Sequence, residues 1–314
     1  MNKNILIKSF EKILEIRVAE EMIAKKFKEN NIYAFLHLYV GQEASAVGIS
    51  KALNSNDIVF GNHRSHGHYL SKGGNFDKMI FEIFGDLRGC CKGYGGSMHM
   101  LDRKVNFAGS GPILGSVAPI TMGMALSLKL KNKKNIAVGF LGDGSAEEGS
   151  FYESINLGGL YNVPALLIIE DNKFSVESNH NDRKVKGYNY SSLFKDGLKA
   201  IYKRVNGNNV LDVYNATKEL KKNILKHKKI GLLHVDLNRL YKHSGANKDS
   251  AKSYYHKKNN LNYFDTDNDC LEVTKKILKK KGISNYYINV IENRTINLTK
   301  EKFNKVFKKI RIKY

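Results

Sequence analysis

The chain has 314 residues, of which 42% are hydrophobic, with 27 glycines and 3 prolines, and this composition predicts a globular protein rather than a disordered one. The formal net charge of +22 would suit nucleic acid, but the lysines are spread among asparagines and isoleucines, so we disfavour nucleic-acid binding. A compositional drift toward lysine, asparagine and isoleucine is one explanation of the charge, and attraction to an acidic protein partner is another. The three cysteines do not form a disulfide or zinc pattern and favour a cytoplasmic location. No run of eighteen apolar residues occurs, so we expect no membrane span.

A helix and a single histidine open the chain. Apolar residues recur close to the helical period from Ser9 to about Asn30, which predicts an amphipathic first helix. The next stretch, AFLHLYVGQEASAVGISKAL, contains His37 and then a run of small residues that predicts a closely packed helix. A lone histidine is more often structural, so His37 becomes a site candidate only if other polar groups converge on it.

Four polar side chains crowd a glycine-rich turn after a short apolar run. They are His63, Arg64, His66 and His68. The planar guanidinium of arginine suits phosphate oxygens, and imidazoles add further donors. Zinc is the weaker alternative because zinc ligands are usually held apart by defined spacing and often include thiolates. The cluster therefore favours an anion site.

Two further segments lead to the centre of the chain. Residues 77–84 have a helical pattern, and the glycine-rich stretch 87–116 predicts a shaped loop that is partly buried, because large apolar side chains are interleaved with its glycines. Pro119 then begins a helix rich in small residues.

The central unit runs from 135 to 178. An apolar strand, IAVGFL, is followed by the turn GDGS and a helix, and a second apolar strand from Val163 to Ile169 is followed by Glu-Asp-Asn. In parallel sheets buried on both faces, ligands bind at the carboxyl ends of such strands. Asp143 and Asn172, 29 positions apart, offer oxygens to magnesium, and the turn presents backbone N–H groups to phosphate. The sequence therefore predicts one metal ion and one phosphate group at this edge.

With these residues in place, the chain resembles the alpha subunit of the thiamine-diphosphate-dependent, decarboxylating component of 2-oxoacid and acetoin dehydrogenase complexes. The spacing of GDGS and Asn172 is similar to that family's cofactor motif, and HLYVGQEA, HRSHGHYLSKGG, KGYGGSMHM, GPILGSVAP and HVDLNRLYKHS match in order. The likeness covers nearly the whole chain and weakens after about Tyr255. It implies an α/β fold with a doubly wound, mostly parallel sheet flanked by helices.

The resemblance also implies a role for particular residues. Asp143, Asn172 and the backbone carbonyl of Phe174 would hold Mg²⁺, and His37 and His243 would be the catalytic histidines. Leu114 matches the position whose backbone contacts the aminopyrimidine ring. The residues implied to bind thiamine diphosphate are His63, Arg64, Leu114, Gly142, Gly144, Ser145 and Asn172.

The same resemblance implies partners. The family works as an alpha-2-beta-2 heterotetramer and passes an acyl group to a lipoyl acyltransferase, so we expect this chain to need a beta subunit and to be inactive alone. Two alternatives stay open: a biosynthetic acyl-transfer enzyme that acts without a lipoyl complex, and a non-catalytic subunit. We expect neither nucleic acid nor membrane as a partner.

Some positions depart from the family pattern. Asp171 stands where an asparagine is usual, and His63 stands where tyrosine is common, although acetoin-type relatives also have histidine there. The loop after His243 is enriched in lysine, and Ser244 and Ser253 align roughly with serines that kinases modify in some members.

The C-terminal region completes the prediction. It reads as two amphipathic helices separated by a polar, asparagine-rich insert, with Thr299 as the N-cap of the last helix. We divide the chain into a thiamine-diphosphate-binding α/β domain, 1–265, and a helical extension, 266–314, that packs on the same domain.

Overall fold

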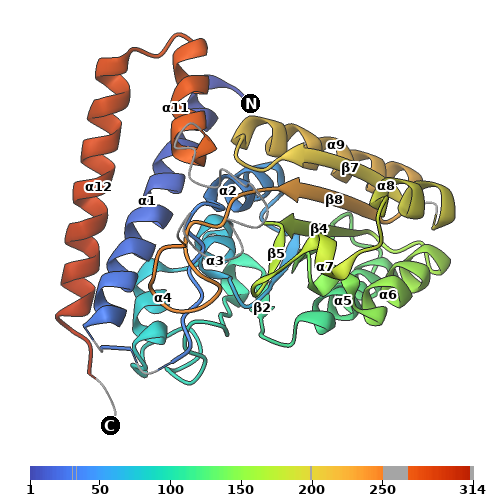
Figure 1. Cartoon of the computed structure of the whole chain (residues 1–314), viewed down its shortest axis with the longest axis horizontal. Coiled ribbons are helices and arrows are strands. Elements are labelled where there is room, and N and C mark those ends of the chain that lie inside the picture. The colour runs from blue at the N-terminus through green and yellow to red at the C-terminus, as the bar shows by residue number, and fades with distance from the viewer. Residues whose placement is uncertain (30, 33, 199, 250–267, 312–314) are drawn as a thin grey trace.

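A computed structural model describes residues 1–29, 31–32, 34–198, 200–249 and 268–311. The predicted domain boundary at 265/266 and Ser253 lie outside these residues. Within them, one six-stranded sheet has the order β2-β1-β3-β4-β8-β7, and every pair is parallel (Figure 1). Its strands are β1 (Ile58–Gly61), β2 (Phe107–Ser110), β3 (Ala137–Gly142), β4 (Ala165–Asp171), β7 (Ile201–Asn206) and β8 (Gly231–Asp236).

Helices cover both faces of this sheet, so the predicted doubly wound α/β class is confirmed (Figure 1). Along β4, Leu166 and Ile168 belong to one hydrophobic core, whereas Leu167 and Ile169 belong to a second core on the opposite face. A strand with buried side chains on both faces must be apolar throughout, which explains the continuous apolar run in the sequence. The first core packs under α1 (Lys3–Lys28), α2 (Glu43–Ala52), α3 (His66–Lys72), α4 (Phe76–Ile83) and α9 (Val210–His227), and the second under α5 (Val117–Leu130) and α6 (Gly149–Leu160).

Short elements complete the description at the site end of the sheet. A small antiparallel hairpin of β5 (Phe174–Ser175) and β6 (Ser178–Asn179) follows β4 directly. After it come α7 (His180–Arg183) and α8 (Tyr190–Ser192). Single turns of 3₁₀ helix occur at Arg103–Val105, Leu114–Ser116 and Ser145–Glu147, and a π-helical turn at Leu193–Gly197.

Most of the predicted elements are present with shifted ends. The first helix begins at Lys3 rather than Ser9, and the helix expected over 77–84 is α4. Pro119 lies in the first turn of α5, where its missing N–H costs no helical hydrogen bond. The stretch 87–116 is partly buried as expected, but it also contains β2, which the glycines concealed.

The C-terminal region differs from its prediction. Two helices are present, α11 (Cys270–Lys280) and α12 (Asn285–Phe307), but the asparagine-rich stretch lies inside α12 instead of separating them. Thr299 is buried in the middle of α12 and its hydroxyl donates to the carbonyl of Thr295 at 2.8 Å, so its assignment as an N-cap was wrong. Ser284 caps this helix instead, accepting from the N–H of Tyr287.

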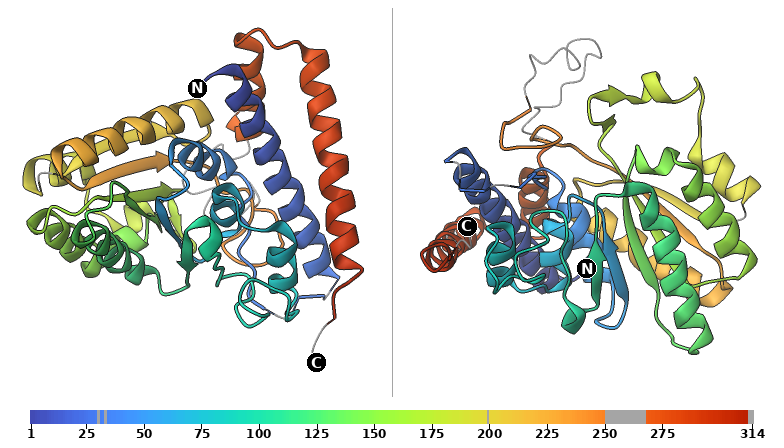
Figure 2. Two further views of the ribbon diagram at one scale, coloured as in Figure 1. Left: turned by 180° about the vertical axis from the view of Figure 1, so that it is seen from behind. Right: turned by 90° about the horizontal axis from the view of Figure 1, so that it is seen from below.

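The buried face of α12 explains this outcome. Ile288, Ile291, Thr295, Thr299, Phe303 and Val306 are buried and recur every three or four residues, so one apolar stripe runs through the whole helix. This stripe packs against α1, and the two helices lie side by side and run in the same direction (Figures 1 and 2). Arg294 of α12 pairs with Glu11 of α1 along the contact. The C-terminal helices thus join their core to that of the first helix.

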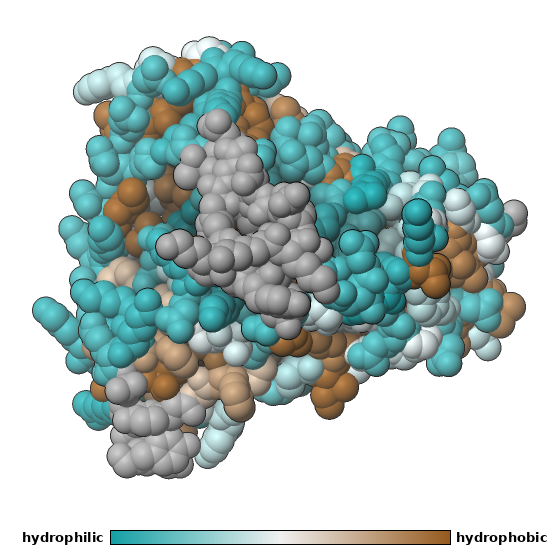
Figure 3. All heavy atoms as spheres, in the orientation of Figure 1, coloured by the Kyte–Doolittle hydropathy of each residue, from teal (hydrophilic) through white to brown (hydrophobic). Residues whose placement is uncertain are grey.

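None of the described helices is long and apolar enough to cross a membrane. The face of the molecule drawn in Figure 3 is largely hydrophilic, and its hydrophobic side chains form separate small patches.

A buried arginine ties three helices together. Arg17 of α1 donates to both oxygens of Glu43 in α2, at 2.5 and 3.0 Å, and to Asp269 beside α11 at 2.8 Å. Glu43 is fully buried, and its remaining contacts are the N–H of Gly41 and the thiol of Cys270. The charge on Glu43 is therefore compensated mainly by Arg17.

We predict that Arg17→Met lowers the free energy of unfolding by about 3–5 kcal/mol, because it leaves a buried carboxylate without its partner. Urea-induced unfolding followed by circular dichroism measures this change. Lys203→Gln, which breaks an exposed pair with Glu219, is the matched control and should cost about 1 kcal/mol or less. Equal losses in the two variants would contradict the prediction.

Candidate functional site

The site begins where β3 and β4 end. Their parallel register pairs Gly142 with Glu170, so Asp143 and Asp171 lie at the same edge of the sheet. The side chains of Asp143 and Asp171 are almost fully buried. β4 ends two residues beyond the predicted strand end, and Asn172 follows it immediately. The predicted meeting of the GDGS turn and the Glu-Asp-Asn segment is therefore confirmed as a spatial arrangement.

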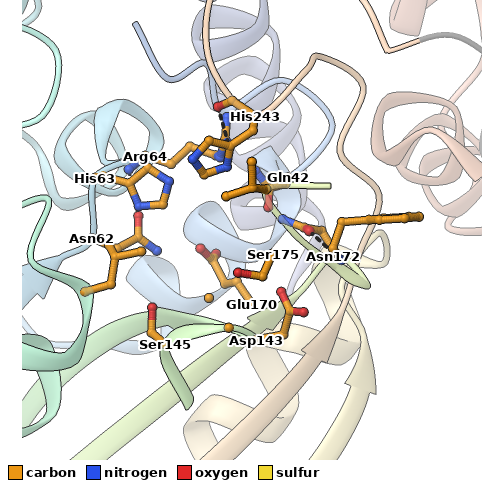
Figure 4. Close-up of a pocket in the computed structure, with 15 residues that line it drawn as sticks. Gln42, Asn62, His63, Arg64, Asp143, Ser145, Glu170, Asn172, Ser175 and His243 are labelled. Atoms are coloured by element: carbon orange, nitrogen blue, oxygen red, sulfur yellow. Dashed lines mark hydrogen bonds between the residues drawn. The ribbon is translucent and has the colours of Figure 1, made fainter. Parts of the chain in front are cut away.

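The turn after β3 forms one wall of a pocket (Figure 4). Gly142, Gly144 and Ser145 line it, and the side chain of Ser175 leaves no space for a Cβ atom at Gly144. The hydroxyl of Ser145 is buried and has no hydrogen-bond partner among the described residues. A buried hydroxyl without a partner indicates a place for a ligand that accepts or donates a hydrogen bond.

Arg64 and His63, which follow β1, stand on the opposite wall (Figure 4). The Arg64 guanidinium donates to the backbone carbonyls of Leu38 and His243, the latter at 2.8 Å. Burial, and then the nearby charge of Arg239, lower the pKa of Arg64 to about 9. Arg64 is therefore still charged at neutral pH and faces the pocket as a cation.

Three imidazoles converge beside this arginine. The ring centroids of His37 and His63 are 4.7 Å apart. The ring centroid of His243 lies 5.2 Å from that of His37 and 5.3 Å from that of His63. Burial, and then the charge of Arg64, lower the pKa of His37 to about 3 and that of His243 to about 4. The same two causes place the pKa of His63 well below its ordinary value. All three rings are neutral at neutral pH.

The other two histidines of the predicted cluster point elsewhere. His66 lies 3.0 Å from Glu20, and His68 lies 2.9 Å from Glu170 and stacks on Phe140. The interpretation of four converging anion donors was therefore wrong for two of the four. The first turn of α3 begins at His66 and turns both rings into the protein interior.

Two basic side chains already contact Asp143. Arg183 of α7 donates to Asp143 at 2.5 Å and to Glu147 at 2.7 Å. His180 lies 3.3 Å from Asp143 and 3.0 Å from Asp171, and although burial disfavours its charge, these carboxylates raise its pKa. Sequence analysis missed both residues, because nothing in their spacing shows that α7 folds back over the turn.

Asp171 is held from a second side. His234 of β8 lies 2.8 Å from its carboxylate, and the backbone N–H of Lys173 donates to it at 2.9 Å. Burial opposes ionisation, but the hydrogen bonds from His180 and His234 outweigh it and lower the pKa of Asp171. The Asp171 carboxylate is therefore ionised, and it contacts two imidazoles and one backbone N–H.

Glu170 is a pocket residue that sequence analysis also missed. It is buried, and its carboxylate accepts from the hydroxyls of Tyr39 and Ser45, the latter at 2.7 Å. Its position directly before Asp171, at the end of a buried strand, was the available signal. The further lining residues that carried no sequence signal are Gln42, Asn62, Ser175 and Val176.

The remaining predicted residues lie at or beside the pocket. Leu114, at the start of a 3₁₀ turn, and Phe174, in β5, both line it. The amide oxygen of Asn172 accepts from the N–H of Phe174 at 3.2 Å, which curves the chain around the pocket. His37 does not line the pocket and reaches it through its contacts with His63 and His243.

The donor set fits the predicted ligands. Asp143 and Asn172 supply a carboxylate and an amide oxygen, which are the ligand types that Mg²⁺ accepts. The Ser145 hydroxyl, the amides of the turn and the Arg64 guanidinium supply donors for phosphate oxygens. A magnesium ion at Asp143 would replace the positive charge of Arg183 there.

The sequence profile of the family described as "Dehydrogenase E1 component" matches residues 11–309. The chain belongs to this family. The chain is 30% identical to the pyruvate dehydrogenase E1 component subunit alpha of Rickettsia bellii over 295 residues, which are 94% of this chain and 89% of that protein.

Two bacterial relatives are more similar over a shorter length. The alpha subunit of acetoin:2,6-dichlorophenolindophenol oxidoreductase is 40% identical in Bacillus subtilis, over 52% of this chain and 50% of that protein. The corresponding subunit from Cupriavidus necator is 39% identical, over 56% of this chain and 53% of that protein. The chain thus spans about half the length of these two curated relatives.

The neutral imidazoles of this dehydrogenase E1 component chain should make its stability depend on pH. His37 has an ordinary pKa of 6.5 and a pKa of about 3 in the folded chain. The His37 imidazole therefore binds a proton more readily in the unfolded chain than in the folded chain. The stability that neutral His37 contributes is fully present above about pH 6.5 and is lost as the pH falls toward 3.

We predict that the free energy of unfolding decreases less steeply from pH 7 to pH 5 in His37→Gln than in the wild type. Urea unfolding at a series of pH values measures the slope. His227→Gln, at an exposed position in α9, should keep the wild-type slope. An unchanged slope in His37→Gln would contradict the prediction, because it would mean that the His37 imidazole has the same pKa in the folded and the unfolded chain.

Proposed function

We propose that this chain is the alpha subunit of a thiamine-diphosphate-dependent dehydrogenase that acts together with a beta subunit. The observation that carries the proposal is the placement of Asp143 and Asn172 at the ends of adjacent parallel strands, with Arg64 across the same pocket. Membership of the dehydrogenase E1 component family supports it. So do relatives named as alpha subunits of acetoin and pyruvate enzymes.

In this proposal the chain holds the diphosphate end of the cofactor. Asp143, Asn172 and the backbone carbonyl of Phe174 bind Mg²⁺. Arg64 and the Gly144–Ser145 turn bind the phosphate oxygens, with Gly142 allowing close approach. When bound, thiamine diphosphate supplies a carbon nucleophile and an electron sink, which side chains lack.

In this proposal three histidines serve the reacting end of the cofactor. His63 and His243 face the pocket, and His37 contacts both (Figure 4). A neutral imidazole can accept a proton from a substrate hydroxyl or donate its own N–H to a developing oxyanion. We assign His243 and His37 to this role, and His63 to the cofactor side of the same cluster.

The substrate is proposed to be acetoin or a pyruvate-like 2-oxoacid, with the acyl group passed to a lipoyl carrier on an acyltransferase. Such substrates differ by small groups, and one methylene in an apolar pocket changes binding by only about 1–3 kcal/mol. In this proposal the choice of substrate depends on the beta subunit as much as on this chain.

The proposed location of the protein is the cytoplasm.

Exposed apolar side chains at the rim of the pocket support the proposal that another subunit binds there. Ile113 beside Leu114 is 74% exposed, and Val176, which lines the pocket, is 53% exposed. Exposed apolar side chains at the mouth of a binding site are typical of a surface that another subunit covers. An alpha-2-beta-2 assembly with the cofactor between the two kinds of chain accounts for this placement.

We predict that Asp143→Ala weakens binding of thiamine diphosphate with Mg²⁺ by more than about 10-fold, because a carboxylate ligand of the metal is lost. Isothermal titration of the chain co-purified with its beta subunit measures the affinity. Glu153→Gln, on the exposed side of α6, is the control and should bind as the wild type. Tight binding by Asp143→Ala would remove Asp143 from the metal site.

We also predict that the purified chain, given thiamine diphosphate and Mg²⁺ but no beta subunit, does not turn over any of these substrates. The measurement is reduction of an artificial electron acceptor with a panel of acetoin, pyruvate and branched 2-oxoacids, with and without the beta subunit. Activity should appear only in the mixture. Turnover by the chain alone would contradict the assembly proposed here.

A further inference from the structure

Three histidine rings meet beside the pocket from segments far apart in the sequence. His37 precedes α2, His63 follows β1, and His243 follows β8. One nitrogen of each lies within 4.8 Å of the nitrogens of the other two. Both nitrogens of His63 and the Nδ1 atom of His37 are buried and have no hydrogen-bond partner within the described ranges. Because buried polar atoms are normally hydrogen-bonded, these nitrogens indicate a missing ligand.

We propose that His37, His63 and His243 form a binding site for a transition-metal ion of the zinc class, separate from the magnesium site at Asp143. Three imidazoles with one open position form a donor set that zinc accepts, and copper and nickel also favour imidazole. Mg²⁺ prefers oxygen ligands and does not compete for such a site. The site exists only in the folded chain, since three separate segments build it.

The histidine cluster needs no deprotonation before it binds a metal ion. Metal ligands must be deprotonated, and these three rings are neutral at neutral pH, so no proton has to leave. The positive charge of the neighbouring Arg64 guanidinium disfavours a bound metal cation. The carboxylates of Glu20 and Glu170 lie close enough to raise the pKa of Arg64, and they offset part of its charge. The site therefore suits an ion that gains strongly from nitrogen ligands.

The geometry requires a modest adjustment. Zinc–nitrogen distances of about 2.0–2.1 Å in a tetrahedral site place the nitrogens roughly 3.4 Å apart. The nitrogens, which lie within 4.8 Å of one another, therefore have to approach by up to about 1.4 Å, which rotation about the side-chain bonds supplies. His63 and His243 line the pocket, so the open coordination position of the ion faces it (Figure 4). An ion held there blocks His243, and this inhibitory consequence rests on the proposed function.

A second group of possible metal ligands, which contains two thiols, could also bind Zn²⁺ in the same experiment. Glu82, Cys90 and Cys91 also lie within reach of one another. The carboxylate of Glu82 already accepts from the backbone N–H groups of Cys91, Gly93 and Gly95. The experiment therefore uses the full-length chain with Cys90→Ser and Cys91→Ser as its background.

The test is titration of Zn²⁺ against a chromophoric chelator, with Co²⁺ absorption spectra as a report of coordination. In the background chain we expect one tightly bound ion and the intense visible bands of tetrahedral Co²⁺. His63→Gln should weaken binding by more than about 10-fold and remove the bands, because one of three ligands is lost. His227→Gln, exposed on α9, should leave both measurements unchanged.

Wild-type affinity and Co²⁺ bands in His63→Gln would overturn the proposal. If His63→Gln does not fold, as judged by circular dichroism, His243→Gln carries the same expectation and the same contradiction. The outcome is independent of the cofactor proposal, because no thiamine diphosphate is added. Zinc binding together with absent thiamine diphosphate binding would overturn the cofactor assignment alone.

Discussion

The site depends on the parallel register of β3 and β4. Because Gly142 pairs with Glu170, the residues that follow both strands emerge at one edge and Asp143 stands beside the Asp171–Asn172 segment. This register is held by two hydrophobic cores, one on each face, in which alternate residues of the same strand are buried. A slip of one residue would exchange the two sets of side chains, so burial on both faces holds the polar residues at the edge in place.

The charged groups at this edge already have hydrogen-bond partners. Arg183 pairs with Asp143, and Arg64 donates to two backbone carbonyls. Buried charges must be paired, because an uncompensated one is costly. A charged ligand that enters this pocket therefore exchanges partners instead of filling unbonded positions. Among the described residues that line the pocket, the Ser145 hydroxyl, the Gln42 amide nitrogen and both nitrogens of His63 are buried without a partner, and these atoms mark where a ligand gains bonds without breaking any.

The C-terminal helices show where local patterns misled. Asparagines have low helix propensity, so the stretch between Leu278 and Thr299 resembled a polar insert. Burial against α1 overrides that preference, since the apolar stripe of α12 continues at helical spacing past every asparagine. The buried contact of Arg17 with Glu43 and Asp269 adds a tie between the same two ends of the chain.

Periodicity and motif spacing in the sequence predicted the two central strands and the shared edge at which Asp143 and Asn172 follow them, because these features lie within about 30 residues of one another. The resemblance to the family supplied the doubly wound α/β class. The residues that resemble the family's motifs also indicated Arg64, His37 and His243. Only the tertiary structure decided that His66 and His68 turn inward, that Glu170 lies in the pocket, and that Arg183 and His180 contact Asp143. It alone brought His37, His63 and His243 together. Side-chain direction and long-range approach are set by packing between distant segments, which leaves no local pattern in a single sequence.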